Sequence, residues 1–509
     1  MSLATDHDRP ATSGEGAPVP HVRVAILGTG FAGLVMALRL REAGETDFVL
    51  LERADDIGGT WRDNTYPGCA CDVPSALYSI SFAPNPDWSF AFSRQPEIQA
   101  YMQRVVTDRG LRPHLRLRHE VLEARWDDAA SRWHVHTSAG DLTADVLVSG
   151  SGALADPVLP DIPGLDTFPG PVFHSARWRH DVELAGKRVA AIGTGASAIQ
   201  FIPEVAKEAA HVTVFQRTAA WVVPRLDFPI SERWKRRFRR HPRLQTAFRA
   251  LVYGIAESQV YGFVRRPDFL DWQKRQALWQ LKKHIEDPEL RARLTPDYHI
   301  GCKRILRSSD FYPALARPNV SVTSGLREVR GATLVAADGS EHTADVLVLG
   351  TGFHASDIPI AKRIVGRDGQ RLSDRWEDGV RTLRGITATG CPNLFFLVGP
   401  NTVLGHSSII YMIESQVAYV MDALRHRAAR GAATVEPTEA AERAWDDEVQ
   451  EKLQGTVWNT GGCRSWYLDD NGRNTTLWPG ATWAYRRATR RFDPREYRLE
   501  PARRGVTVG

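Results

Sequence analysis

The apolar positions of the chain form two similar patterns, each a short β-branched run that breaks into glycines. Residues 22–27 (VRVAIL) predict a buried strand that runs into Gly28-Thr29-Gly30-Phe31-Ala32-Gly33. The next stretch, LVMALRLREAG, has helical spacing and stops at Gly44, and FVLLE then ends at Glu52. The order strand, glycine turn, helix, strand and acid predicts a dinucleotide-binding unit with a parallel sheet.

Each part of this first turn has a physical role in holding a dinucleotide. The first glycine permits a tight turn, the second lets the backbone approach a pyrophosphate, and the third lets the helix pack closely. The helix N-terminus offers free N–H groups to the phosphates. The acid, 24 residues after the first glycine, is placed to accept hydrogen bonds from a ribose diol. The predicted contacts are Gly28, Gly30, Phe31, Ala32, Gly33 and Glu52.

The same order recurs from residue 188 with one change of charge. RVAAI predicts a strand, IQFIPEVAKEA a helix after the glycine loop, and HVTVFQR a second strand that ends at Arg217. A carboxylate there would repel a ribose 2′-phosphate, whereas a guanidinium binds it, so this unit should prefer NADP to NAD. The predicted contacts are Gly193, Thr194, Gly195, Ala196, Ser197, Ala198, Gln200, Arg217 and Thr218.

Two sites of opposite charge predict two different cofactors, FAD in the first and NADPH in the second. A chain built in this way passes a hydride from nicotinamide to flavin. Three classes of enzyme share the plan. A disulfide reductase needs a Cys-x-x-Cys pair, which this sequence lacks. A plain NADPH oxidase or redox sensor needs nothing further, and a monooxygenase needs a protected flavin with a group that tunes it.

Composition excludes only a few classes of protein and site. At 509 residues the chain should form two or three domains, and its net charge of +5 is too small to indicate nucleic acid. Five scattered cysteines predict free thiols in a reducing cytoplasm rather than a disulfide framework, and Cys69-x-Cys71 fits no zinc site, so we predict no metal. No apolar run approaches the roughly 18–20 residues of a membrane helix. Residues 1–20 are expected to be a disordered tail.

Two longer motifs give the chain a resemblance to a known family. Phe168, Gly170, His174 and Trp178 fit F-x-G-x-x-x-H-x-x-x-W, and residues 58–72 fit [AG]G-x-W-x4-[FY]-P-[GM]-x3-D. On these residues the chain resembles the Baeyer–Villiger monooxygenases, which turn ketones into esters or lactones with FAD, NADPH and molecular oxygen. Arg179 departs from the Pro or Asp that follows the tryptophan in that family. His174 and Trp178 would then transmit domain rotation rather than act chemically.

The resemblance also implies which residues form the site. Arg304 would be the cation that stabilises the flavin peroxide and the anion formed on a ketone, as an oxyanion hole does, and Asp72 would hold it in place. Lys303 would reach the NADP phosphate, and Trp466 would contact NADP, with plain packing as the alternative for this tryptophan. The other implied FAD contacts are Gly59, Thr60, Trp61, Asp72, Tyr78 and Val121.

The resemblance favours oxygen insertion beside a small-molecule ketone carbonyl. Nitrogen or sulfur oxygenation, and a non-oxygenating NADPH oxidase or redox sensor, remain the alternatives. The substrate ketone and the oligomeric state do not follow from the sequence.

The fold class is therefore α/β, with two Rossmann-like dinucleotide-binding domains, for FAD and NADP, and a helical insertion in the NADP domain. We place FAD-binding segments at 21–155 and 385–509, NADP-binding segments at 156–225 and 301–384, and the insertion at 226–300. The insertion is basic and rich in aromatic residues. Its cluster Lys235, Arg236, Arg237, Arg239 and Arg240 is interpreted as a solvated helix face, with a membrane surface or an acidic partner as the alternative.

Overall fold

The structure is a computed structural model of the chain that describes residues 19–152, 154–354, 358–469 and 471–501. Its first large sheet has the strand order β17-β4-β5-β6-β1-β2-β3, with β18 paired to β6. The strands beside β1 are parallel, whereas β4, β5 and β6 form an antiparallel meander. The bounds are β1 His21–Leu27, β2 Phe48–Glu52, β3 Leu115–Leu117, β4 Val121–Asp127, β5 Arg132–Thr137, β6 Gly140–Ser149, β17 Ile364–Val365 and β18 Leu394–Phe396.

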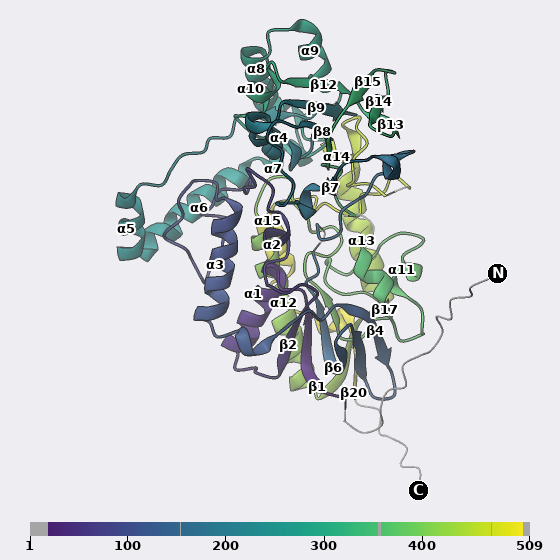
Figure 1. The fold of residues 1–509 in the computed structure, drawn as a ribbon. Helices are drawn as coiled ribbons and strands as arrows, with labels where there is room; N and C mark the ends of the chain where they lie inside the picture. The colour runs from purple at the N-terminus through teal and green to yellow at the C-terminus, as the bar shows by residue number, and fades with distance from the viewer. Residues whose placement is uncertain (1–18, 153, 355–357, 470, 502–509) are drawn as a thin grey trace, which may run out of the picture.

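The second sheet is wholly parallel and lies above the first in Figure 1, in the order β12-β9-β8-β16-β7. Its central strands are buried on both faces, as parallel strands between helices must be. A small antiparallel sheet, β13-β14-β15, packs beside it. The bounds are β7 Val172–His174, β8 Arg188–Ile192, β9 His211–Gln216, β12 Val320–Ser324, β13 Leu326–Arg330, β14 Thr333–Ala336, β15 Glu341–Thr343 and β16 Val346–Leu349.

The two glycine-loop helices are α1 (Phe31–Glu42) and α4 (Ala198–Glu208). Nearly every residue of α1 is buried, because the helix is enclosed between the first sheet and α12 (Ile409–Ala429). The remaining elements around these domains are α2 Thr60–Asp63, α3 Gln95–Asp108, α10 Phe311–Leu315, α11 Leu372–Arg375, α13 Glu439–Gln454, α14 Val457–Thr460, α15 Thr482–Ala488, β19 Ala432–Pro437 and β20 Tyr497–Pro501.

The basic segment after β9 is helical, as expected, and leaves the second domain between two short paired strands. β10 (Val222–Val223) pairs in parallel with β11 (Leu306–Arg307), and the helices lie between them in the sequence. α5 and α6 project sideways from the molecule, whereas α8 and α9 cover the second domain (Figure 1). The bounds are α5 Glu232–Arg240, α6 Pro242–Ser258, α7 Val260–Val264, α8 Asp271–His284 and α9 Pro288–Arg293.

Two of the expected segments differ from or fall outside what the structure describes. Strand β17 pairs with β4, so the chain returns to the first sheet before the boundary that we placed after residue 384. The first 18 residues of the expected tail lie outside the described residues. Among the described helices none is long and apolar enough to cross a membrane.

Candidate active site

The first glycine loop has the three backbone features that its spacing predicts. Gly28 has a φ of +92°, and a side chain there would meet the Gly150 carbonyl oxygen at 2.8 Å. A Cβ on Gly33 would overlap the Gly28 carbonyl oxygen, so this position holds α1 against the turn. Gly30 instead faces open space, with nothing within 4 Å of an added Cβ. The fold needs the outer two glycines, and the middle one leaves room for a pyrophosphate.

The N-terminus of α1 is free to bind an anion. No side chain caps this end of the helix, because the N-cap residue is Gly30. The first turn begins with Phe31 and Ala32 and carries no acidic residue. The N–H groups of this turn and the positive end of the helix dipole therefore suit the phosphates of a dinucleotide. These features fit the predicted FAD.

Glu52 ends β2 beside this loop and is buried. The Thr29 hydroxyl and backbone N–H donate to Oε2 at 2.6 and 3.1 Å, and the Ala54 N–H donates to Oε1 at 3.0 Å. Arg62 forms an ion pair with Oε1 at 2.8 Å. Burial raises the pKa of Glu52, but the Thr29 hydrogen bond and Arg62 outweigh it, so the pKa lies below its usual value. Sequence reasoning missed Arg62, which directly follows the predicted contacts Thr60 and Trp61.

The motif at residues 58–72 lies against the first glycine loop. The Gly58 N–H donates to the Thr29 carbonyl at 3.1 Å, and a Cβ on Gly59 would lie 3.2 Å from the Gly30 Cα. The Trp61 indole N–H donates to the Tyr78 hydroxyl at 3.0 Å, and the Tyr78 ring also meets that of Phe31 edge-on. The structure thus gathers the predicted residues at 58–61 and 78 around one loop.

Val121 lies apart from this group. It begins β4 and is buried in the core cluster that contains Val49 and Leu51 of β2. Its contact with FAD stays a prediction.

The second glycine loop repeats the geometry of the first. Gly193 has a φ of +105°, and a Cβ there would lie 2.5 Å from the Gly350 carbonyl oxygen, whereas Gly195 faces open space. Ala198 begins α4 and is fully buried, and Ser197 makes no side-chain cap on that helix. The Thr194 hydroxyl donates to the Thr218 carbonyl at 3.2 Å and ties the loop to the end of β9.

Two cations meet beside the second loop. Arg217 is exposed at the end of β9, and neither it nor Lys303 forms an ion pair with any residue that the structure describes. Lys303 lies over the Tyr298 ring, with 4.9 Å from Nζ to the ring centroid. Burial, and after it the charge of Arg217, lowers the pKa of Lys303. Two neighbouring cations without a bound carboxylate fit the 2′-phosphate of the predicted NADP.

Gln200 is committed to contacts between the two domains. Its side-chain carbonyl accepts from the Tyr66 hydroxyl at 3.1 Å and from the Ala70 N–H at 3.2 Å, and its amide donates to the Ala70 carbonyl at 3.1 Å. A Cβ on Gly68 would lie 2.7 Å from the Gln200 carbonyl oxygen. Helix α4 therefore packs on the Tyr66-Pro67-Gly68 turn, and the predicted NADP contact of Gln200 stays a prediction.

Asp72 and Arg304 form an ion pair that joins the motif at residues 58–72 to the segment that follows the helical insertion. The Arg304 Nε and Nη2 donate to the two carboxylate oxygens of Asp72 at 2.7 and 2.8 Å, across 232 residues of sequence. The charge of Asp72 raises the pKa of Arg304. Burial raises the pKa of Asp72, but the nearby guanidinium more than offsets this, so its pKa lies below the usual value. The pair is therefore fully charged at neutral pH, and both side chains keep part of their surface exposed.

A family assignment follows from comparison with known proteins. The flavin-binding monooxygenase-like family model matches residues 21–363. The chain belongs to this flavin-binding monooxygenase-like family. A Baeyer–Villiger monooxygenase of Streptomyces coelicolor is 57% identical over 485 residues, covering 95% of this chain and 93% of that relative. One of Pseudomonas aeruginosa is 48% identical over 503 residues, covering 97% and 95%.

Solved structures of flavin monooxygenases have the same fold. An oxidized steroid monooxygenase bound to NADP matches with a TM-score of 0.84 at 30% identity, over 95% of this chain and 100% of that one. A cyclohexanone monooxygenase from Rhodococcus sp. Phi1 bound to NADP+ matches with a TM-score of 0.84 at 27% identity, over the same shares. The α/β fold with two Rossmann-like domains is thereby confirmed.

The fingerprint of this monooxygenase lies at the edge of the second sheet. His174 ends β7, accepts from the Ala176 N–H at 3.1 Å and lies edge-on to Phe353. Burial lowers the pKa of His174 to about 4, so it is neutral at physiological pH. A Cβ on Gly170 would overlap the Asp345 carbonyl oxygen, which explains this glycine. Trp178 packs on Phe173 and Phe201.

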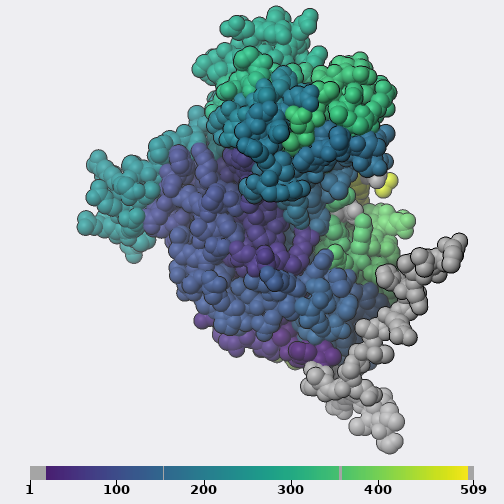
Figure 2. All heavy atoms as spheres, in the orientation of Figure 1, coloured from purple at the N-terminus to yellow at the C-terminus, as the bar shows by residue number. Residues whose placement is uncertain are grey.

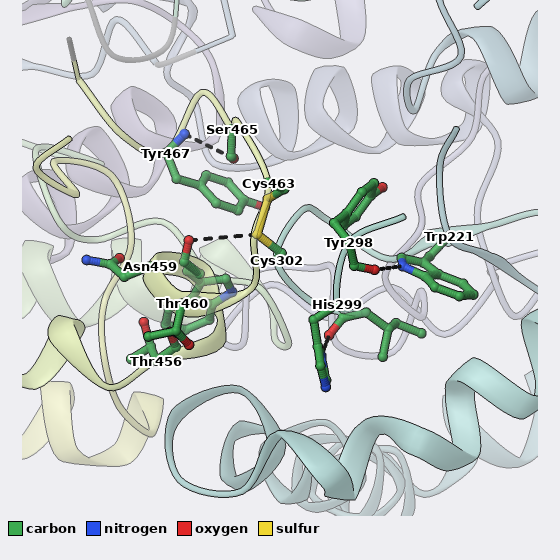
Figure 3. The surroundings of a disulfide bond; sticks show 12 residues. Trp221, Tyr298, His299, Cys302, Thr456, Asn459, Thr460, Cys463, Ser465 and Tyr467 are labelled. Carbon is green, nitrogen blue, oxygen red and sulfur yellow. Dashed lines mark hydrogen bonds between the residues drawn. A yellow bond between two sulfur atoms is a disulfide. The ribbon is translucent and has the colours of Figure 1, made fainter. Parts of the chain in front are cut away.

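The free-thiol prediction is wrong for two cysteines. Cys302 and Cys463 form a disulfide (Figure 3), although 161 residues separate them. Cys69, Cys71 and Cys391 are free and buried. The sequence gives no sign of this pair, because only the fold brings the segment before Arg304 next to residues 461–468. A Cβ on Gly461 would lie 2.6 Å from the Cys302 Cβ, so only glycine fits beside the bond.

The disulfide joins the Arg304 segment to the loop that carries Trp466. The His299 N–H donates to the Gly461 carbonyl at 2.9 Å. The Tyr467 hydroxyl interacts with the backbone of Arg304. Tyr467 is buried beside the disulfide (Figure 3), whereas Trp466 is exposed and lies edge-on to it. Sequence reasoning missed Tyr467, whose only signal is its place next to Trp466.

The disulfide predicts a defined thiol count. Unfolded protein should expose three reactive thiols without reductant and five after reduction, as measured with a thiol-specific chromophore. Cys463→Ser should lower the free energy of unfolding by about 2–4 kcal/mol, because the open loop gains entropy in the unfolded chain. The control is Cys391→Ser, which removes a thiol but no cross-link. Five reactive thiols in unreduced protein would show that the bond does not form.

Proposed function

We propose that this chain is an NADPH- and O2-dependent Baeyer–Villiger monooxygenase that inserts an oxygen atom next to a ketone carbonyl and gives an ester or lactone. The observation that carries the proposal is the Asp72–Arg304 pair, in which a carboxylate at the end of the motif at residues 58–72 fixes a permanently charged guanidinium. The relatives from Streptomyces coelicolor and Pseudomonas aeruginosa, both named Baeyer–Villiger monooxygenases over nearly the whole chain, support it.

FAD, when bound, supplies the chemistry that takes electrons from NADPH and activates molecular oxygen. The first glycine loop and the residues around it would hold FAD, with the N-terminus of α1 at the phosphates. Glu52 would offer its carboxylate to the ribose in competition with Arg62. Trp61 and Tyr78 would line the flavin side of the loop, where their mutual hydrogen bond fixes both rings.

Arg217, Thr218 and Lys303 would hold the 2′-phosphate of NADPH. Charge-assisted hydrogen bonds from two cations to a phosphate are stronger than neutral ones, and NADH cannot make them. Trp466 would contact the same cofactor from the loop tied down by the disulfide. This arrangement would let bound NADP shield the reacting centre from water.

Arg304 would act by its charge on the reacting atoms. Oxygen insertion next to a ketone places negative charge on the former carbonyl oxygen, and a fixed guanidinium stabilises that charge without reorganisation. Asp72 would be a positioning residue, because it binds two nitrogens of the guanidinium and leaves the remaining N–H groups free to point at substrate.

Nitrogen or sulfur oxygenation is the second candidate, and it would require a protonated oxidant. Arg304, whose pKa is raised, and Asp72, whose pKa is lowered, both keep their charge at neutral pH and so do not protonate an oxidant, and this favours the ketone reaction. We also propose a cytoplasmic enzyme, since NADPH is an intracellular cofactor.

The NADP assignment predicts a cofactor switch on loss of Arg217. Arg217→Ala should raise the KM for NADPH by roughly 10- to 100-fold, as expected for losing a charged hydrogen bond of about 1.5–3 kcal/mol. The KM for NADH should change less than threefold, because NADH has no 2′-phosphate. Steady-state rates of NADPH and NADH oxidation at varied cofactor concentration measure both constants. Equal losses for the two cofactors would mean that Arg217 does not read the phosphate.

The role of Arg304 predicts a loss of ketone oxidation with retention of flavin. Arg304→Ala should lower ester formation about 100- to 1,000-fold, the cost of removing one stabilising donor. Bound FAD, measured by absorbance, should remain, and NADPH should instead be converted to hydrogen peroxide. Arg304→Lys, which keeps the charge but not the bidentate geometry, should retain part of the rate.

The assay compares NADPH use, ester and hydrogen peroxide across a panel of cyclic and linear ketones. Ester formation by Arg304→Ala at the wild-type rate would remove Arg304 from the mechanism. Wild-type enzyme that converts every NADPH to peroxide with every ketone would favour the redox-sensor alternative.

A further inference from the structure

Helix α6 has its polar face turned toward the protein and its apolar face turned toward solvent. Gln245 donates to the Asn85 carbonyl at 2.7 Å, and Arg249 donates to the carbonyls of Ala76 and Ser79 at 2.8 and 2.9 Å. One and two turns further on, the Tyr253 hydroxyl bonds to Thr482 and the Glu257 carboxylate accepts from it. This row, spaced by four residues, is the inner side of the helix.

The opposite side of α6 is an apolar stripe. Leu244, Phe248, Leu251 and Ile255 are spaced by four, three and four residues, which places them on one face. Their exposed fractions are 39%, 39%, 61% and 60%. Exposed apolar residues that stand singly are ordinary on a protein surface, but a continuous stripe along one helix marks an interaction site.

The stripe continues onto α5. The Phe238 ring stacks on Phe248, and the half-exposed Trp234 packs on Phe238. Arg237 lies over the Trp234 ring, with 5.0 Å from Cζ to the ring centroid, so a cation borders the apolar surface. These two helices form the arm that projects from the body in Figures 1 and 2.

The arm belongs to a strongly basic part of the chain. Residues 232–284 contain fourteen Lys and Arg residues against four Asp and Glu residues, a net charge of +10, whereas the whole chain carries +5. The rest of the protein is therefore net acidic. On α5, Arg233, Arg236 and Arg240 are exposed and form no ion pair with any described residue.

We propose that α5 and α6 form a docking surface for an anionic lipid bilayer. The apolar stripe of α6 enters the boundary between headgroups and acyl chains, and the α5 arginines bind lipid phosphates, as in a basic amphipathic helix lying in a membrane interface. The contacts of α6 with Ala76 and Ser79, next to the predicted FAD contact Tyr78, attach the arm rigidly to the FAD domain.

Charge and side-chain chemistry favour a bilayer over a second copy of the chain or a nucleic acid as the occupant of this surface. A second copy of the chain would bring two basic arms together, because both the α5 end and Arg265 and Arg266 beyond α7 carry positive charge. A nucleic acid would meet the arginines but offers no apolar surface to Leu251 and Ile255. A bilayer with anionic headgroups matches both features, and the solvated-face interpretation of the basic cluster leaves the apolar stripe unexplained.

The test is co-sedimentation of the FAD-loaded enzyme with vesicles of phosphatidylcholine alone or mixed with phosphatidylglycerol. Wild-type enzyme should bind the anionic vesicles at least tenfold more tightly than the neutral ones, and 0.5 M salt should release it. Leu251→Asp/Ile255→Asp and Arg236→Glu/Arg240→Glu should each weaken binding at least tenfold. Leu159→Asp, at an exposed leucine outside the arm, is the matched control and should bind as wild type does.

NADPH oxidation without vesicles should stay unchanged in all variants, which shows that each is folded and holds its cofactors. Equal, weak binding of wild type to both vesicle types would overturn the proposal. A wild-type dimer by sedimentation velocity that Leu251→Asp/Ile255→Asp converts to a monomer would assign the stripe to a second copy instead. Salt-sensitive binding of duplex DNA, unaffected by that variant, would assign the arginines to nucleic acid.

Discussion

A bidentate ion pair between Asp72 and Arg304 joins the end of the motif at residues 58–72 to the segment that follows the helical insertion. Withdrawing two charges from water is costly, and only close geometry with further hydrogen bonds makes such a pair favourable. Here both guanidinium–carboxylate bonds are short, and neighbouring groups hold the arginine segment on each side. Cys302 is cross-linked to residue 463, the Leu306 N–H donates to the Trp221 carbonyl, and Tyr467 reaches the Arg304 backbone.

Backbone constraints shape both cofactor loops in the same way. At both loops the first glycine has a positive φ and abuts the carbonyl of a glycine that directly follows a strand of the same sheet, Gly150 after β6 or Gly350 after β16. The middle glycine of each faces open space, so each loop has room for phosphates against a helix N-terminus. The difference between the loops lies in the charged side chains beside them. The first has the buried carboxylate of Glu52, and the second has Arg217 and Lys303, neither of which forms an ion pair with a described residue.

Much of this could be predicted from the sequence, because the glycine roles and strand-end charges are local requirements. The positive φ of Gly28 and the close fit of Gly33 against the Gly28 carbonyl belong to one turn, and the acid or base that ends the next strand follows from the βαβ unit. The Asp72–Arg304 contact, across 232 residues, was implied only by the family resemblance, and two other long-range contacts were not predicted. The amide of Gln200 bonds to the other domain, and the Cys302–Cys463 bond depends on how two distant loops meet.

Helix α6 shows that periodicity alone does not predict which face of a helix is buried. Its spacing identifies an apolar row and a polar row, but periodicity does not say which of them faces the protein. The usual expectation, with the apolar row inside, is reversed because the inner row supplies hydrogen bonds to the carbonyls of Asn85, Ala76 and Ser79. Only the assembled structure reveals that the apolar row is exposed.

The most direct test of the account is a double-mutant cycle at the central pair, made with Asp72→Asn, Arg304→Gln and the combined variant. The quantity measured is the rate of ester formation from one accepted ketone, with bound FAD quantified in each protein. If Asp72 acts only by placing the guanidinium, the combined variant should be no slower than Arg304→Gln alone, and the two losses should be strongly non-additive. Losses that multiply, or an Asp72→Asn variant as fast as wild type, would contradict the claim that this pair positions the charge for oxygen insertion.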